Sequence, residues 1–140
     1  MAEEIKKIEW DDSYLLGIPE IDLQHKKLIA IANELYDVIS GDENQCKTSM
    51  PKILKKLTDY TVYHFSNEEE LMQKIGYIGF NMHKNTHELF IKEVNFQIQN
   101  LSIERKSALL AFYKYIASWV FSHIAKADKL WATFKKENGK

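Results

Sequence analysis

The chain has few of the residues that break a helix or cross-link a fold. Its 140 residues include one cysteine, two prolines and five glycines. The lone Cys46 cannot form an internal disulfide, which argues against a disulfide-stapled secreted scaffold and favours a reducing compartment. With so few turn residues the intervening segments are long, and none alternates apolar and polar residues as a half-buried strand does. The sequence therefore predicts long helices.

Excess charge and long apolar runs are also missing. Lys and Arg number 19, Asp and Glu number 20, and the net charge is −1, so there is no electrostatic footprint for nucleic acid or anionic lipid. No run approaches the roughly 20 apolar residues of a membrane span. The first residues carry charge from Glu3 and contain no signal-peptide core. We expect one soluble domain over residues 1–140, cytoplasmic and monomeric, with no nucleic-acid or membrane partner.

Four amphipathic segments lie between the turn signals. Pro51 fits the first turn of the second helix, with Thr48 or Ser49 as its cap. Four such helices with short connections pack most simply as an all-α, up-down-up-down antiparallel bundle. The predicted elements are an irregular N-terminal arm (1–19), helices at about 20–40, 48–75, 81–99 and 103–126, and a tail (127–140) containing a short C-terminal helix.

All five histidines fall at positions that helical periodicity assigns to the core. A spacing of four residues puts two side chains on one face of a helix, and two such pairs occur. Buried imidazoles and carboxylates are costly without partners. In an up-down-up-down bundle every one of these residues reaches the same end, where a metal would satisfy them together. The candidate ligands are His25, His64 with Glu68 four residues later, His83 with His87, and His123.

Asp128 is a seventh candidate ligand. It follows His123 by five residues, which is about 140° around a straight α-helix. Both side chains can face inward if the helix either widens into a π-type turn or ends there. Such irregularities are frequent at functional sites.

The ligand set indicates two metal ions. Imidazole with carboxylate suits iron, zinc, copper or nickel, and argues against calcium or magnesium. Seven ligand residues are too many for one ion. If two six-coordinate irons share both carboxylates and one oxo or hydroxo group, about eleven of the twelve coordination positions are filled. The position left open would suit end-on binding of a gas.

Residues next to the ligands have ordinary explanations. Glu69 and Glu70 are expected to be solvated. Asp22 and Gln24 could bond a ligand from behind, but a first-turn acid and a surface residue need no such role. Cys46 is expected in a polar loop.

Several segments together resemble the hemerythrin family, specifically its single-domain bacterial form. They are Trp10, residues 21–26 (IDLQHK), residues 64–69 (HFSNEE), His83 with His87, and residues 119–124 (WVFSHI) with Asp128. The resemblance spans nearly the whole chain, and every ligand position is filled. Trp10 is expected to pack the arm onto the bundle.

The resemblance implies how the ligands are shared and what they bind. One iron would be held by His83, His87 and His123, and the other by His25 and His64. Glu68 and Asp128 would bridge the two, together with an oxo or hydroxo group. Dioxygen would bind reversibly at the open position of the two-histidine iron, for oxygen storage, delivery or buffering. Its pocket would be lined by Phe65, Trp119, Val120, Ile124 and Leu28.

The implied function leaves alternatives. The same centre could sense oxygen, nitric oxide or redox state, or act as a peroxidase, oxidase or nitric oxide reductase. Small anions are further candidate ligands, and the sequence leaves a protein partner unknown. Iron storage is disfavoured, because buried histidines form a fixed site instead of a mineral cavity. Val120 stands where the family commonly has leucine, which bears on how well the pocket excludes water.

Overall fold

Helices make up nearly all of the chain that the computed structural model describes, residues 6–138, and no strand occurs in that range. Residues 1–5 of the predicted arm and 139–140 of the tail lie outside the described residues. The elements are the 3-10 helix η1 (Asp12–Tyr14), α1 (Pro19–Ser40), α2 (Glu43–Lys74), α3 (Phe80–Gln99), α4 (Lys106–Ser122), the π-helix η2 (His123–Asp128) and α5 (Lys129–Glu137).

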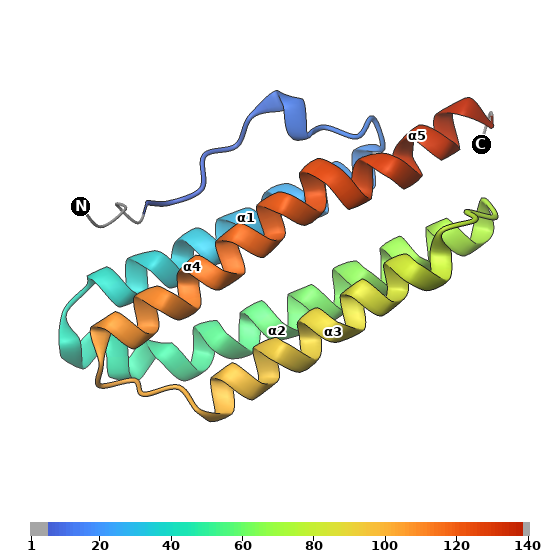
Figure 1. Ribbon diagram of the computed structural model, residues 1–140. Helices are drawn as coiled ribbons and strands as arrows, with labels where there is room; N and C mark the ends of the chain where they lie inside the picture. The colour runs from blue at the N-terminus through green and yellow to red at the C-terminus, as the bar shows by residue number, and fades with distance from the viewer. Residues whose placement is uncertain (1–5, 139–140) are drawn as a thin grey trace, which may run out of the picture.

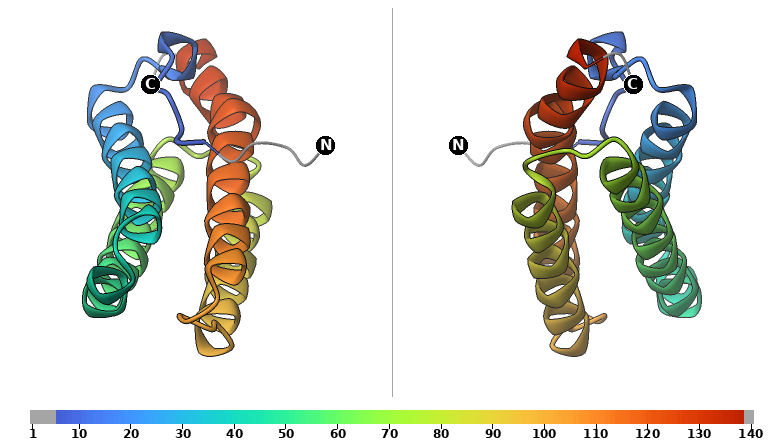
Figure 2. Two further views of the ribbon diagram at one scale, coloured as in Figure 1. Left: turned by 90° about the vertical axis from the view of Figure 1, so that its left-hand side faces the viewer. Right: turned by 90° about the vertical axis from the view of Figure 1, so that its right-hand side faces the viewer.

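The four long helices form the predicted antiparallel bundle. In Figure 1, α1 and α4 lie together in one layer, and α2 and α3 in the other. Short connections join consecutive helices at alternate ends, and the two views of Figure 2 show α1 and α2 on one side of the bundle and α3 and α4 on the other. The helix α5 continues α4 through η2 and extends beyond the start of α1 (Figure 1). The all-α, up-down-up-down prediction is confirmed.

The start of α1 holds the N-terminal arm against the bundle. Pro19 occupies the first turn, where its missing N–H costs nothing, and Asp22 is buried there. The Asp22 carboxylate accepts hydrogen bonds from the backbone N–H of Leu16 (2.8 Å) and Gly17 (3.2 Å). Gly17 has φ of 82°, a left-handed conformation that glycine adopts readily. Asp22 therefore fixes the turn that leads the arm into α1.

Nearer the N-terminus, side chains of the bundle bind the arm. The backbone N–H of Ile8 donates to Asn33 Oδ1, and Asn33 Nδ2 donates to the Ile8 carbonyl, both at 2.8 Å. The Tyr113 hydroxyl donates to the Lys6 carbonyl at 2.8 Å. Trp10 packs against the core, as predicted. The arm is thus a fixed strap along α1 and α4 (Figure 1).

The helix α2 begins earlier than predicted. It starts at Glu43, not near residue 48, and its cap is Asp42, whose carboxylate accepts a hydrogen bond from the Gln45 N–H at 3.3 Å. Pro51 lies inside the helix, and Cys46 is buried in it rather than in a polar loop. A good cap and the burial of Cys46 and neighbouring apolar residues outweigh the backbone hydrogen bond that proline cannot donate.

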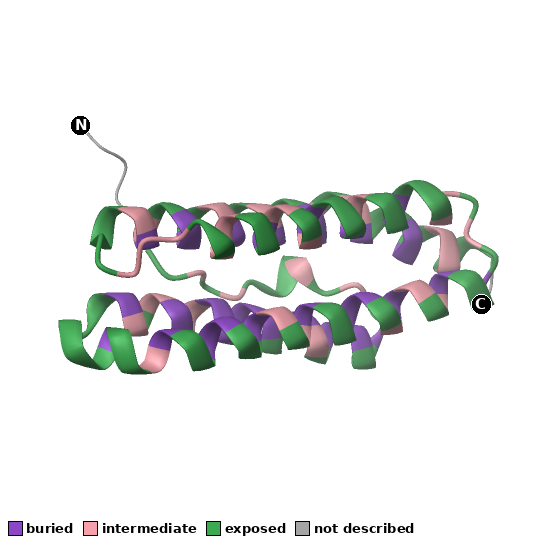
Figure 3. Cartoon of the chain, turned by 90° about the horizontal axis from the view of Figure 1, so that it is seen from below, coloured by how far each residue is buried: buried purple, intermediate pink, exposed green. Residues whose placement is uncertain are grey.

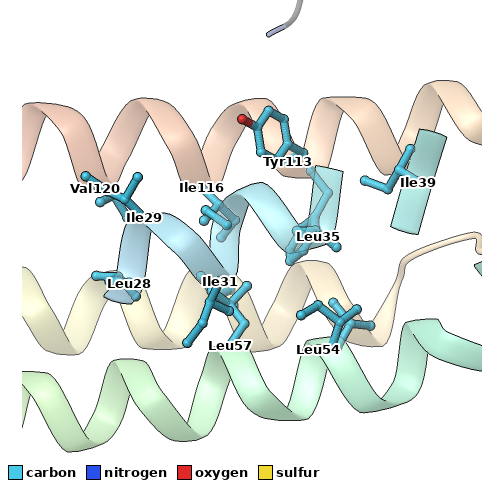
Figure 4. Close-up of a cluster of buried hydrophobic side chains, with 14 of the residues drawn as sticks. Leu28, Ile29, Ile31, Leu35, Ile39, Leu54, Leu57, Tyr113, Ile116 and Val120 are labelled. Atoms are coloured by element: carbon cyan, nitrogen blue, oxygen red, sulfur yellow. The ribbon is translucent and has the colours of Figure 1, made fainter. Parts of the chain in front are cut away.

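Buried apolar side chains form two clusters. Figure 3 shows how buried and exposed positions alternate along the helices that supply them. The larger fills the length of the bundle, and Figure 4 shows its residues from α1, α2 and α4 pointing toward one another. The smaller closes one end and consists of Ile18, Ile21, Met72, Ile75, Trp131 and Ala132. On α1, His25 falls between the two clusters, and on α2, His64 and Glu68 flank Phe65, the last residue of the larger cluster on that helix, ahead of Met72 of the smaller one. The ligand layer therefore has apolar residues on both sides. No helix within residues 6–138 is both long enough and apolar enough to traverse a bilayer.

Candidate metal centre

The seven predicted ligands converge on one buried layer. Their exposed fractions run from 0% for His25, Glu68, His87 and Asp128 to 6% for His83 and His123. Their donor atoms form two groups, within each of which all atoms lie inside 4.8 Å of one another. The first group is Glu68, His83, His87, His123 and Asp128, and the second is His25, His64, Glu68 and Asp128.

A π-helix brings Asp128 to the site. Of the two alternatives for the stretch from His123 to Asp128, the structure contains the widened turn, η2. Its backbone bonds span five residues, so side chains five apart return to one face. The distance from His123 Nε2 to Asp128 Oδ1 is 3.1 Å. On a straight α-helix the two would diverge, and Asp128 would leave the centre.

Both carboxylates divide their oxygens between the two histidine groups. Glu68 Oε1 lies 2.7 Å from His83 Nε2, whereas Oε2 lies 3.1 Å from His64 Nε2. Asp128 Oδ1 lies 3.1 Å from His83 Nε2, whereas Oδ2 lies 3.0 Å from His25 Nε2. One oxygen of each carboxylate therefore faces the three-histidine group and the other faces the two-histidine group, as bridging ligands require.

The donor spacing fits metal ions better than hydrogen bonds. Ligands at right angles about an ion, each about 2.1 Å from it, are about 3 Å apart, and most of the contacts above are near that value. His87 Nε2 and His123 Nε2 lie 3.0 Å apart, so their lone pairs would repel unless one nitrogen carries a proton or both face a cation. The pair of sites is thus shaped for cations.

Unpartnered polar atoms support the same fit. Within residues 6–138, both ring nitrogens of His25, Glu68 Oε2 and both oxygens of Asp128 are buried without a hydrogen bond, and their near neighbours are the other candidate ligands, such as His25 Nε2 at 3.0 Å from Asp128 Oδ2. Leaving several such atoms unpaired in one spot would be costly, and metal coordination would satisfy all but the outward ring nitrogen of His25. The residues present therefore fit two metal ions.

Without metal, the buried imidazoles and carboxylates form ion pairs with one another. Burial lowers the pKa of His25, but the Asp128 and Glu68 carboxylates outweigh it and raise that pKa to about 9. The same opposition raises the pKa of His83 and of His123 to about 9. Burial and Glu68 act to raise the pKa of Asp128, yet the neighbouring imidazoles bring it down to about 2, and imidazoles lower that of Glu68 well below its usual range against burial. In the metal-free protein, protons on these imidazoles take the place of cations.

Two outer side chains orient the ligands from behind. Gln24 Oε1 lies 2.7 Å from His64 Nδ1, and Glu69 Oε2 lies 2.8 Å from His87 Nδ1. Each oxygen accepts a hydrogen bond, which places the ring proton on Nδ1 and leaves the Nε2 lone pair free for metal. The expectation that Glu69 is solvated is wrong. The helix α2 packs against both α1 and α3 and therefore buries more of its surface than the single seam through His64 and Glu68. A second apolar face on α2, turned toward α3, was the signal that could have identified Glu69.

Replacing Glu69 by glutamine should weaken metal binding. A carboxylate behind His87 makes that imidazole a stronger donor than an amide would, and loss of such partners typically costs about 10- to 100-fold in metal affinity. Competition with a chromophoric chelator measures the change. Glu70→Gln, one residue along and exposed, is the matched control and should bind metal as the wild type does. Equal affinities for both variants would contradict an orienting role for Glu69.

Aromatic rings surround the three-histidine group. Phe65 stacks on His87 with centroids 3.8 Å apart, and Trp119 stacks on His123 at 4.4 Å. Of the predicted pocket residues, Trp119 is half-buried, whereas Phe65, Val120, Ile124 and Leu28 are buried in the larger apolar cluster. Phe65 and Trp119 thus contact ligands directly, and Val120, Ile124 and Leu28 are core residues within one helical turn of a ligand in the sequence.

Comparisons with known proteins agree with this site. A family model described as the hemerythrin HHE cation-binding domain matches residues 16–134. The chain is 32% identical to a bacteriohemerythrin of Clostridium acetobutylicum over 122 residues, covering 86% of this chain and 95% of that protein. It is 35% identical to a bacteriohemerythrin of Pseudomonas aeruginosa, covering 85% and 75%.

The fold has a counterpart among solved structures. The crystal structure of a leucine-to-tyrosine mutant of hemerythrin superimposes with a TM-score of 0.73 at 28% identity, covering 90% of this chain and 95% of that one. A hemerythrin-like protein of Naegleria gruberi is 33% identical in sequence, covering 85% of this chain and 86% of that protein. Family match, fold and buried histidine–carboxylate cluster coincide, and the chain therefore belongs to the hemerythrin family of non-haem iron proteins.

Proposed function

We propose that this protein holds two iron ions and binds dioxygen reversibly, for oxygen storage, delivery or buffering. The observation that carries the proposal is the unequal sharing of ligands: two groups have both carboxylates in common, but one has three histidines and the other has two. The group with His25 and His64 is therefore one ligand short, and a small molecule can bind there. We further propose that residues 1–140 form a single domain acting as a cytoplasmic monomer.

The side chains have separate tasks. His83, His87 and His123 would hold one ion, His25 and His64 would hold the other, and Glu68 and Asp128 would serve both. Two ferrous ions held there would supply the two electrons that a reversible reduction of dioxygen requires. The protein contributes a fixed geometry and a dry pocket lined by Phe65, Trp119, Val120, Ile124 and Leu28, which lie in the apolar core or against it.

Ligand chemistry favours a carrier over an oxidising enzyme. Bundle proteins whose di-iron sites are rich in glutamate supply anionic charge to the metals. Here five of the seven ligands are imidazoles, which are neutral when they coordinate metal. A less anionic ligand set stabilises high-valent iron less, and release of intact dioxygen is then favoured. The relatives named bacteriohemerythrin support the same reading.

Cycling between air and an oxygen-free atmosphere tests the proposal. Metal analysis of protein purified without added iron comes first, since zinc in the site would leave the fold and remove the redox chemistry. The anaerobic ferrous protein should develop an oxo-to-iron charge-transfer band in air and lose it on degassing, over several cycles. An enzyme would instead finish ferric or consume reductant, and a sensor would change shape or partner affinity without turnover. Either result would replace the carrier assignment.

A further inference from the structure

An apolar cavity lies beside the candidate metal centre, outside the ligand layer. Its volume is about 50 Å³, and it opens along the seam between α2 and α3. Val62 and Asn95 are exposed at its outer side, and Ile116 and Val120 of α4 are buried at its inner side. The remaining lining residues are Leu57, Thr58, Thr61, Phe90, Ile91 and Val94. The cavity thus spans the distance from the surface to the core of the bundle.

The lining suits a small apolar molecule. Most of the lining side chains are hydrocarbon. The hydroxyl groups of Thr58 and Thr61 donate to backbone carbonyls of the preceding turn, at Leu54 and Leu57, so neither has its donor free for water. A water molecule needs two to four polar partners to occupy a buried site, whereas apolar cavities stay dry and accept xenon. The space is large enough for a diatomic gas.

The inner end of the cavity touches the proposed dioxygen pocket. Val120 lines the cavity and is also one of the five residues of that pocket. His64 follows Thr61 by one helical turn on α2, and His87 precedes Phe90 by one turn on α3. The Phe65 ring stacks on His87 and lies 6.1 Å from the Phe90 ring, which lines the cavity. A molecule in the cavity is therefore one layer of side chains from the metal layer.

From these contacts we infer that the cavity between α2 and α3 binds a small apolar gas, namely dioxygen, and is its access route to the metal centre, past Val120. The binding site itself depends on the cavity alone. Its use as a route rests on the proposed dioxygen function. The two parts are separable by experiment, because xenon reports on the cavity whether or not the metal is active.

Xenon titration of the full chain, with and without metal, tests the binding site. Methyl resonances of Val62, Ile91, Val94, Ile116 and Val120 should shift saturably with xenon pressure, whereas those of Leu23 and Leu130, exposed elsewhere on the molecule, should not. Val94→Phe fills the space and should weaken xenon binding by roughly tenfold or more, and Val94→Ala enlarges it and should strengthen binding. Both changes disturb packing, so a general loss of stability would move both variants in the same direction.

Dioxygen association tests the route. In stopped-flow mixing of the ferrous protein with oxygen, Val94→Phe should slow association several-fold, and saturating xenon should slow the wild type likewise. Leu89→Phe is the matched control, since Leu89 is on the same helix, 59% exposed and outside the cavity lining. Absence of saturable xenon binding would overturn the site. Xenon binding with unchanged association in Val94→Phe would overturn the route, and a protein that binds xenon but never releases dioxygen would refute the proposed function and leave the cavity site intact.

Discussion

Replacing Glu68 by glutamine will leave the purified protein with about one iron ion per chain or fewer, against about two in the wild type. In the structure the two oxygens of Glu68 face different histidine groups, 2.7 Å from His83 Nε2 and 3.1 Å from His64 Nε2. A glutamine side chain keeps one oxygen, loses the negative charge and presents an N–H₂ group to the second ion. It cannot bridge. Metal analysis after purification from iron-supplemented cells measures the loss.

A matched variant separates this effect from general damage to α2. Glu70→Gln makes the same chemical change two residues away on the exposed side of α2, and it should retain full iron content and the charge-transfer band. Circular dichroism of both variants checks that the bundle is folded, because Glu68 also balances the charge of several imidazoles in the metal-free form. A folded Glu68→Gln protein carrying as much iron as Glu70→Gln would remove Glu68 from the ligand set.

The metal-free protein will lose stability as the pH rises from about 6.5 to about 9. His25, His83 and His123 have pKa values of about 9 when folded, against about 6.5 when unfolded. The folded state therefore binds more protons in this window, and its stabilisation is complete below pH 6.5 and gone above pH 9. The free energy of unfolding should fall by at least a few kcal/mol across this window, because a shift of one pKa unit corresponds to about 1.4 kcal/mol.

Metal binding should show the opposite dependence. Because iron displaces the protons on the same three imidazoles, its apparent affinity should rise across the same window, with up to about three protons released per chain at pH 7. Urea unfolding at pH 5, 7 and 9, with and without metal, measures the first effect, and proton release in weak buffer measures the second. Metal-free protein as stable at pH 9 as at pH 6 would show that these imidazoles are not charged in it. At the acid end, the stabilisation from Asp128, whose pKa is about 2, should be complete above about pH 4 and be lost as the pH falls from there to about 2.

The bundle and the convergence of the seven candidate ligands could both be predicted from the sequence, because polar side chains at core positions need partners. A histidine or carboxylate in an apolar seam is costly without a partner, so the presence of His25, His64 and His123 in three different seams favours a shared metal site. Because Asp128 follows His123 by five positions, the sequence predicted either a π-type widening or the end of the helix there, and the π-helix η2 is present. The spacing of apolar and polar residues along each helix is therefore enough to predict which side chains face the core.

Other features depend on which neighbour a helix faces, and a single seam does not reveal that. Glu69 lies about 100° around α2 from Glu68 and is solvated if only α1 is considered. Because α3 packs on the adjoining side of α2, Glu69 instead meets His87. The start of α2 was misplaced for a related reason: Pro51 has a strong local preference for a first turn, whereas burial of Cys46 and Met50 extends the helix back to Asp42.

The wide turn at η2 also sets which changes of chain length the fold tolerates. Adding or deleting one residue between His123 and Asp128 would rotate everything beyond it by about 100°. Trp131, fully buried against the closed end of the bundle, would then swing toward solvent together with the ligand. That segment is closed to insertions and deletions, while the connection between α3 and α4, which carries no ligand and little of the core, can vary in length without disturbing the metal layer.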